Sequence, residues 1–281
     1  MASVPEDNAA LRDPGPDRSD ASGAPGVAGS LQEPHSHHGA GRIRWGSIVA
    51  TLVAAAVLLV AQDSGYAATL GVTLVLALAL VWGWPRLTGS WTPVATTIVL
   101  GVASVAIVLS ALREDLLWVP AAVAFGIVLA FVGQLVRRTG REGLVLTLLS
   151  SFGGLVVIAS GTTAVVAADT HRGQAVAVVA MAAVAAAVVA DLLGGVRVAA
   201  PLLGFVALVV GMLAAVVASR FAEVGTLEAL GIGAAVGTVS WSFRRVLALE
   251  PAVLTARGQV SPGVGSVLVV GAVVHLFSVL T

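Results

Sequence analysis

The sequence lacks cysteine and lysine, and only 11% of its 281 residues are charged. Without cysteine the chain can form no disulfide, no thiolate metal site and no cysteine nucleophile. At the same time 58% of the residues are hydrophobic and the mean hydropathy is +0.99, values far above those of soluble globular domains. This composition predicts an integral membrane protein, and its bias toward Arg, Ala, Val and Gly suggests a GC-rich bacterial genome.

Other absences exclude whole classes of activity. The sequence contains no Gly-rich loop followed by lysine, no zinc-ligand pair on a helix and no dinucleotide-binding glycine fingerprint. Asp169, His171 and Arg172 lie close together, but no serine or cysteine nucleophile accompanies them, so we interpret them as a solvated loop. Because the Gly-rich loop followed by lysine is missing, ATP-driven transport by this chain alone is excluded. We expect no cofactor, no bound metal and no nucleic-acid partner.

Residues 1–41 contain no apolar run and are rich in Pro, Gly, Ala, Ser and Asp. Such a segment cannot bury enough apolar surface to offset the loss of chain entropy, so it is predicted to be a disordered cytoplasmic tail. Within it, His35, His37 and His38 could chelate a transition metal, although clusters of this kind more often bind nothing specific.

Residues 42–281 are predicted to form the transmembrane domain, because apolar stretches there alternate with short polar connectors. About 20 residues at 1.5 Å each cross a hydrocarbon core of ~30 Å, and backbone groups in lipid must bond within their own helix. The fold class is therefore all-α, a polytopic helical membrane bundle of about nine transmembrane helices. The spans are expected near 45–62, 67–84, 92–112, 116–136, 144–167, 174–193, 199–219, 227–243 and 262–280.

Arginine placement predicts the topology, because short cytoplasmic loops retain basic residues. The bias is ten arginines at one set of span ends against three at the other. The larger set is Arg42, Arg44, Arg86, Arg137, Arg138, Arg141, Arg197, Arg244, Arg245 and Arg257, and the smaller is Arg113, Arg172 and Arg220. We therefore expect a cytoplasmic N-terminus and a location in the bacterial cytoplasmic membrane.

Hydroxyl-bearing residues cluster in the fifth expected span, which contains Ser150, Ser151, Ser160, Thr162 and Thr163. Such side chains let helices approach closely and form hydrogen bonds between them. Alternatively they line a substrate path, with the glycines of the same span permitting a break in the helix at mid-membrane, as in transporters.

Ionisable residues inside spans are costly and therefore informative, and the expected spans contain Asp191, Glu228 and His275. Asp191 and Glu228 lie near span ends, where they can reach the headgroup region. His275 lies about 9 Å of helix from the outer end, where a neutral imidazole bonded to another helix suffices, and a proton relay is the alternative. The lack of a central acid argues against a carboxylate-driven pump.

The C-terminal segment contains an ordered series of polar residues. Ser242 and the pair Arg244-Arg245 are followed, after four residues, by Glu250-Pro251, and residues 261–266 read Ser-Pro-Gly-Val-Gly-Ser. From Gly237 onward this order resembles the C-terminal part of the phosphatidate cytidylyltransferases. These multi-span enzymes make CDP-diacylglycerol from phosphatidate and CTP.

The resemblance implies a degenerate relative of that family. The family's acidic positions, which are expected to hold a divalent cation, correspond here to Val269 and Ala272, and neither offers a ligand oxygen. Such a relative is expected to be inactive but to bind lipid headgroups through Arg244, Arg245 and Arg257. Topology and attraction to anionic lipids explain the same arginines without any kinship.

Three functions remain open. A permease-like or other non-enzymatic bundle is favoured by short loops and by the lack of any extramembrane domain able to host catalysis. The alternatives are a lipid-processing protein of the family above and an envelope assembly partner. The lipid bilayer is the expected partner, with anionic headgroups at the arginines, and protein partners are left open.

Overall fold

The computed structural model describes residues 45–113, 115–137, 142–193 and 200–280, which belong to one compact unit, Gly39–Thr281. All regular structure within these ranges is helical, which confirms the all-α prediction for the described part of the chain. The predicted tail with its three histidines lies outside the described residues. The same holds for Arg42, Arg44, Arg138, Arg141 and Arg197.

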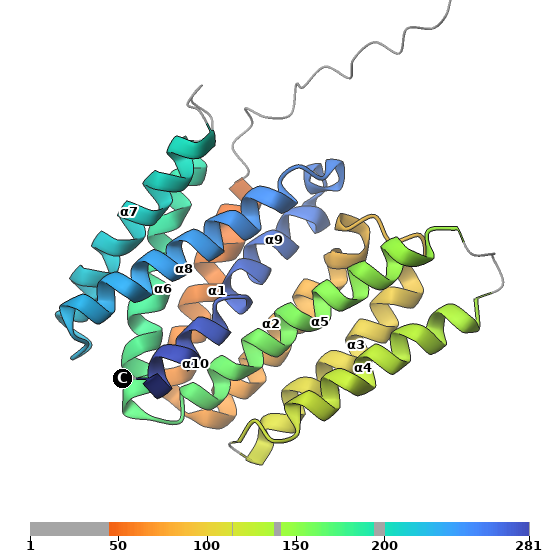
Figure 1. The fold of residues 1–281 in the computed structure, drawn as a ribbon, viewed down its shortest axis with the longest axis horizontal. Helices are drawn as coiled ribbons and strands as arrows, with labels where there is room; N and C mark the ends of the chain where they lie inside the picture. Colours follow the sequence, from red (N-terminus) through yellow and green to blue (C-terminus); the bar gives the residue numbers. More distant parts are fainter. Residues whose placement is uncertain (1–44, 114, 138–141, 194–199, 281) are drawn as a thin grey trace, which may run out of the picture. The chain divides into compact units, whose positions relative to one another are not determined.

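The helices of the described ranges follow one another with short connections (Figure 1). They are α1 (Trp45–Ser64), α2 (Tyr66–Leu87), α3 (Pro93–Ser110), η1 (Ala111–Arg113), α4 (Val119–Leu135), α5 (Leu144–Ala167), α6 (His171–Leu193), α7 (Ala200–Ser219), α8 (Thr226–Leu247), η2 (Pro251–Leu254), α9 (Ala256–Leu268) and α10 (Gly271–Leu280).

Seven helical segments in the described part of the chain are long and apolar enough to cross a membrane. They are α1, α2, α3 extended by η1, α5, α6, most of α7, and the segment Arg257–Leu280, which joins α9 and α10. Helix α4 is also apolar but has 17 residues, and α8 has 22 residues but contains Glu228, Arg244 and Arg245. The chain is thus compatible with a multi-pass membrane protein.

The outward surfaces of the helices are apolar as well. Phe205, Leu213 and Val217 are exposed on α7, and Val128 and Leu135 are exposed on α4. A soluble monomer rarely exposes contiguous apolar surface of this extent. These side chains suit a lipid environment, where an apolar surface carries no hydration cost.

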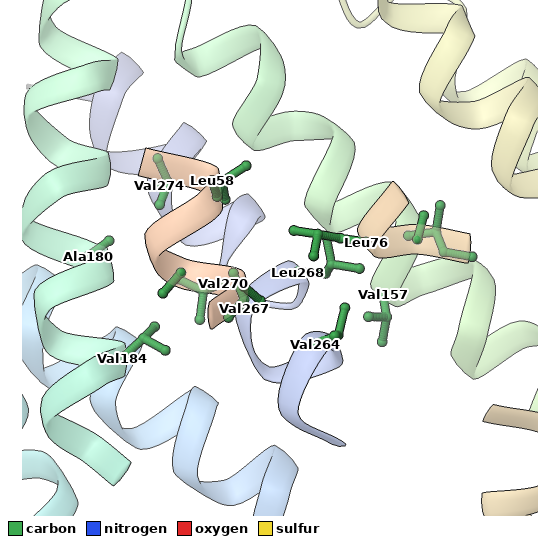
Figure 2. Close-up of a cluster of buried hydrophobic side chains, with 14 of the residues drawn as sticks. Leu58, Leu76, Val157, Ala180, Val184, Val264, Val267, Leu268, Val270 and Val274 are labelled. Carbon is green, nitrogen blue, oxygen red and sulfur yellow. The ribbon is translucent and has the colours of Figure 1, made fainter. Parts of the chain in front are cut away.

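The last segment lies in the middle of the bundle. Helix α9 packs against α1, α2 and α8, and α10 packs against α5 and α6. On one side α6, α7 and α8 pack against one another, and on the other α2 and α5 pack with α3, while α4 contacts α3 and α5 (Figure 1). Figure 2 shows the core at this point. Side chains of α9, α10 and their junction lie among residues of α1, α2, α5 and α6, including Leu58, Leu76, Val157, Ala180, Val184, Val264, Val267, Leu268, Val270 and Val274.

The largest departure from the expected spans concerns this last segment. We expect one helix over 262–280, whereas the structure has a helix that begins at Ala256 and stops at Leu268, and a second that begins at Gly271. The earlier start has a local cause, because the Thr255 hydroxyl accepts a hydrogen bond from the N–H of Gly258 (3.0 Å) and caps the helix. At the interruption, the segment forms hydrogen bonds with Ser160 of α5.

Candidate functional site

The last segment is interrupted at residues 269–270. There two backbone hydrogen bonds join residues that are three apart in the sequence. The N–H of Val270 bonds to the carbonyl of Val267, and the N–H of Val273 bonds to the carbonyl of Val270. Ser160 of α5 supplies partners at the break: its Oγ donates to the carbonyl of Val269 (2.8 Å) and accepts from the N–H of Ala272 (2.9 Å). One hydroxyl therefore satisfies two backbone groups that lipid could not.

Two glycines let the chain segments meet at this point. Gly161 of α5 lies against Leu268, and a side chain at Gly271 would overlap the carbonyl oxygen of Ser160. A hydroxyl has a short reach, so Ser160 can bridge the break only because α5 and α10 approach this closely. The break is therefore part of a helix–helix contact.

A buried polar network lies beside the break. Arg244, near the end of α8, is only 4% exposed. Its Nε donates to Oδ2 of Asp191 on α6 (2.6 Å), and its Nη1 donates to Ser240 (2.6 Å) and to Ser266 of α9 (3.2 Å). Ser266 also shares a hydrogen bond with Thr51 of α1 (3.4 Å). The network joins four helices just before the interruption, and Nη2 of Arg244 is buried without a hydrogen-bond partner among the described residues.

A second ion pair lies near the other end of α6 and α8. Nη2 of Arg172 donates to the two carboxylate oxygens of Glu228 at 2.8 and 2.9 Å. Our interpretation of His171 and Arg172 as loop residues is therefore corrected, because both belong to the first turn of α6. Arg172 and Asp191 are separated by about 28 Å of helix at 1.5 Å per residue. The two ion pairs thus join the same two helices at opposite ends.

The hydroxyl residues of α5 divide into two groups. Ser160 and Ser150 contact other segments. Ser150 shares a hydrogen bond with the hydroxyl of Thr88, the residue after α2, and its carbonyl accepts from the Trp84 indole (2.8 Å). Thr147 also contacts another segment, because its hydroxyl accepts from the N–H of Trp91 (3.3 Å). The hydroxyls of Ser151, Thr162 and Thr163 bond back to carbonyls of α5 itself. Helix α5 runs without a break, so the break considered for this span is not present. The interruption occurs instead between α9 and α10.

The other candidate residues lie in different surroundings. His275 is half-buried in α10, and its Nδ1 is buried without a hydrogen-bond partner in the described part of the chain. Arg245 is half-buried, and Arg257 is exposed with its guanidinium 4.6 Å from the centre of the Trp82 ring. Of these three arginines, only Arg244 is buried.

The chemistry available at the break and the network is hydrogen bonding and charge pairing. Within the described ranges no group of three or more His, Asp or Glu side chains is placed to hold a metal ion. Reasoning span by span missed the pairing of Asp191 with Arg244 and of Glu228 with Arg172, because it considered each acid alone. No protein-family model, no curated protein and no solved structure matches this chain.

Proposed function

We propose that the protein is permease-like and carries a small solute across the membrane without covalent chemistry. The observation that supports this most directly is the interrupted last segment, held at its break by Ser160 of α5. Carriers bind substrates and ions beside discontinuous helices, because the ends of the half-helices present backbone dipoles within the membrane. The network of Arg244 and Ser266 adds polar groups beside this break in an otherwise apolar bundle.

The proposal includes a topology of nine spans with the N-terminus in the cytoplasm, in a bacterial cytoplasmic membrane. Helix α4 is at the lower limit of spanning length, about 17 residues. Helix α8 is supported by its pairing, because Glu228 and Arg244 bond to α6 instead of facing lipid. The two ion pairs align α8 parallel to α6, so α7 must return the chain between them. The arginine bias supports the orientation.

A second candidate is a non-catalytic relative of the phosphatidate cytidylyltransferases that binds a lipid phosphate. It is favoured by the buried Nη2 of Arg244, a donor of the type that binds phosphate and one without a partner among the described residues. Incubation of the purified protein with phosphatidate, labelled CTP and magnesium is expected to give no CDP-lipid above background. Formation of CDP-lipid would instead make the protein an active enzyme of that class.

A flux assay tests the permease proposal. The full-length protein is reconstituted into liposomes loaded with a defined mixture of amino acids, amines, organic acids and sugars, and the efflux of each is followed by mass spectrometry. We expect at least one solute class to leave faster than from protein-free liposomes. The substitution Ser160→Ala should slow that efflux, because it removes both hydrogen bonds that hold the break.

The matched control is Ser151→Ala, which removes a hydroxyl from the same helix that bonds only within that helix. It is expected to leave the flux unchanged. If every solute class leaves at the protein-free rate, the protein does not act as a carrier of small solutes. If both substitutions slow the efflux equally, the break is not the element that matters.

A further inference from the structure

A cavity of about 610 Å³ opens where the end of α1, the start of α6 and the connection between α7 and α8 meet. Its volume falls within the range of small-molecule sites, about 300–1,000 Å³. Part of the wall is apolar and includes Leu59, Val178 and Phe221. The polar part consists of Gln62, Asp63, His171, Arg172, Gln174 and Glu223.

The most informative residue of this wall is Gln62. It is 4% exposed, and both its Oε1 and its Nε2 are buried without a hydrogen-bond partner in the part of the chain that the structure describes. Buried amides are almost always satisfied, because a lone one loses its hydration and receives nothing in return. An N–H group of a ligand in the cavity can supply the partner that Oε1 lacks. Gln62 therefore indicates that the cavity is built to be occupied.

The charges around the cavity are unbalanced. Arg172 is already paired with Glu228. No described cation pairs with Asp63 or Glu223, so the wall presents two carboxylates without counter-charge. His171 is exposed. A cation is attracted to this arrangement and an anion is repelled.

Glu223 is held in an unusual backbone conformation. Its φ of 50° lies in the left-handed region, and no other non-glycine residue in the described ranges has a positive φ. Such conformations are costly for residues with a side chain and are found preferentially at functional sites. Here the unusual φ occurs in a residue of the cavity wall, in the short connection before α8.

We infer that this cavity binds a small organic cation with a primary ammonium head and an apolar arm. The ammonium group donates hydrogen bonds to Oε1 of Gln62 and to the carboxylates of Asp63 and Glu223. The arm packs against Leu59 and Val178. A primary amine fits better than a quaternary one, because only N–H groups can satisfy the Gln62 oxygen.

The inference that the cavity binds an organic cation does not depend on transport. The inference that a transported solute enters here rests on the proposed function. The two statements can fail separately, since binding is measured by occupancy and transport by flux.

The absence of cysteine makes a direct occupancy test possible. The substitution Ala175→Cys places a single thiol in the cavity wall, and its reaction rate with a membrane-impermeant maleimide is measured in lipid nanodiscs. The probes are benzylammonium, benzyl alcohol and benzoate, which share an apolar arm and differ in charge. Leu117→Cys, in the connection between η1 and α4, serves as the reference thiol outside the cavity.

We expect benzylammonium to slow labelling of the cavity thiol in a saturable manner, with little effect of the other two probes and none at the reference thiol. In the same background, Gln62→Leu and Asp63→Asn should each raise the half-protecting concentration roughly tenfold, the value of one charge-assisted hydrogen bond. Asp63 is exposed at the end of α1, so its substitution leaves the fold intact even if Gln62→Leu does not.

Equal protection by all three probes, or by none of them, would overturn the inference. Protection that persists unchanged in both Gln62→Leu and Asp63→Asn would do the same. Protection by benzylammonium without flux of any solute would leave the binding site standing and remove the permease. Flux of other solutes without protection by benzylammonium would leave the permease standing and remove the binding site.

Discussion

The substitution Ser160→Ala tests whether Ser160 of α5 stabilises the interruption in the last segment. In the wild-type protein one hydroxyl serves the carbonyl of Val269 and the N–H of Ala272. Alanine removes that hydroxyl and leaves the packing volume nearly unchanged. Val269 is half-buried and Ala272 is exposed, and lipid at this surface offers neither backbone group a replacement.

The expected loss of stability follows from the hydrogen bonds that the two backbone groups lose. Ordinary hydrogen bonds between membrane helices are worth about 0.6 kcal/mol each, so two would give about 1.2 kcal/mol. A buried polar group left without any partner costs about 1–3 kcal/mol. The second value applies here, because neither group has an alternative partner in apolar surroundings. For the two groups we expect a loss of about 2–6 kcal/mol in the free energy of unfolding.

Thermal unfolding followed by the fluorescence of the six tryptophans measures this loss. For a chain of this size it corresponds to a fall in Tm of about 4–24 °C. Hydrogen exchange at the amide of Ala272 should accelerate in the same variant. The control Ser151→Ala removes a hydroxyl whose acceptor, the carbonyl of Thr147, belongs to the same helix, and it should cost below about 1 kcal/mol. If the two substitutions cost the same, Ser160 does not hold the break.

Three further predictions concern other parts of the structure. Asp191→Asn leaves Arg244 buried without its counter-charge and should destabilise the fold by about 3–5 kcal/mol, part of which Arg244→Gln should restore in the double variant; a neutral single substitution would contradict the buried pair. Glu223→Gly should raise the free energy of unfolding by about 1 kcal/mol because glycine adopts a positive φ without strain, whereas Glu223→Ala should not, and equal effects would show that the backbone is unstrained. Single cysteines test the topology: Leu117→Cys should react with an impermeant maleimide added to intact cells, and Leu254→Cys should react only after permeabilisation, while the opposite pattern would invert the orientation.

Helix α5 shows what apolar runs predict well. The expected bounds, 144–167, coincide with those of the helix, because the information is local. Gly143, in a left-handed conformation with a φ of 67°, precedes the first residue. Ala168 and then the polar residues Asp169 and Thr170 follow the last. Between these ends nothing competes with the helix, so hydropathy alone is sufficient.

The last segment shows where local information ends. Residues 262–280 form a nearly continuous apolar run, and nothing at Val269 or Val270 indicates an interruption. At the break the hydrogen-bond partner is Ser160, which is 109 residues away from Val269 in the sequence. Gln62 presents the same difficulty, since its position at the end of a span says nothing about whether its amide finds a partner. Both features arise only when helices distant in sequence are packed together.

The two ion pairs between α6 and α8 are intermediate in how well the sequence predicts them. Their pattern can be read from the sequence once the two helices are considered together. Helix α6 has a base at its start and an acid near its end, Arg172 and Asp191, and α8 has the opposite order, Glu228 and Arg244. Parallel packing brings opposite charges together at both ends. Antiparallel packing would place Arg172 beside Arg244 and Asp191 beside Glu228, and like charges in a medium of low dielectric repel strongly. A shift of one helical turn, about 5.4 Å, would also separate both pairs at once. The charge order therefore selects both the direction and the register of α8 against α6, and that register brings Arg244 within reach of Ser266, just before the break in the last segment.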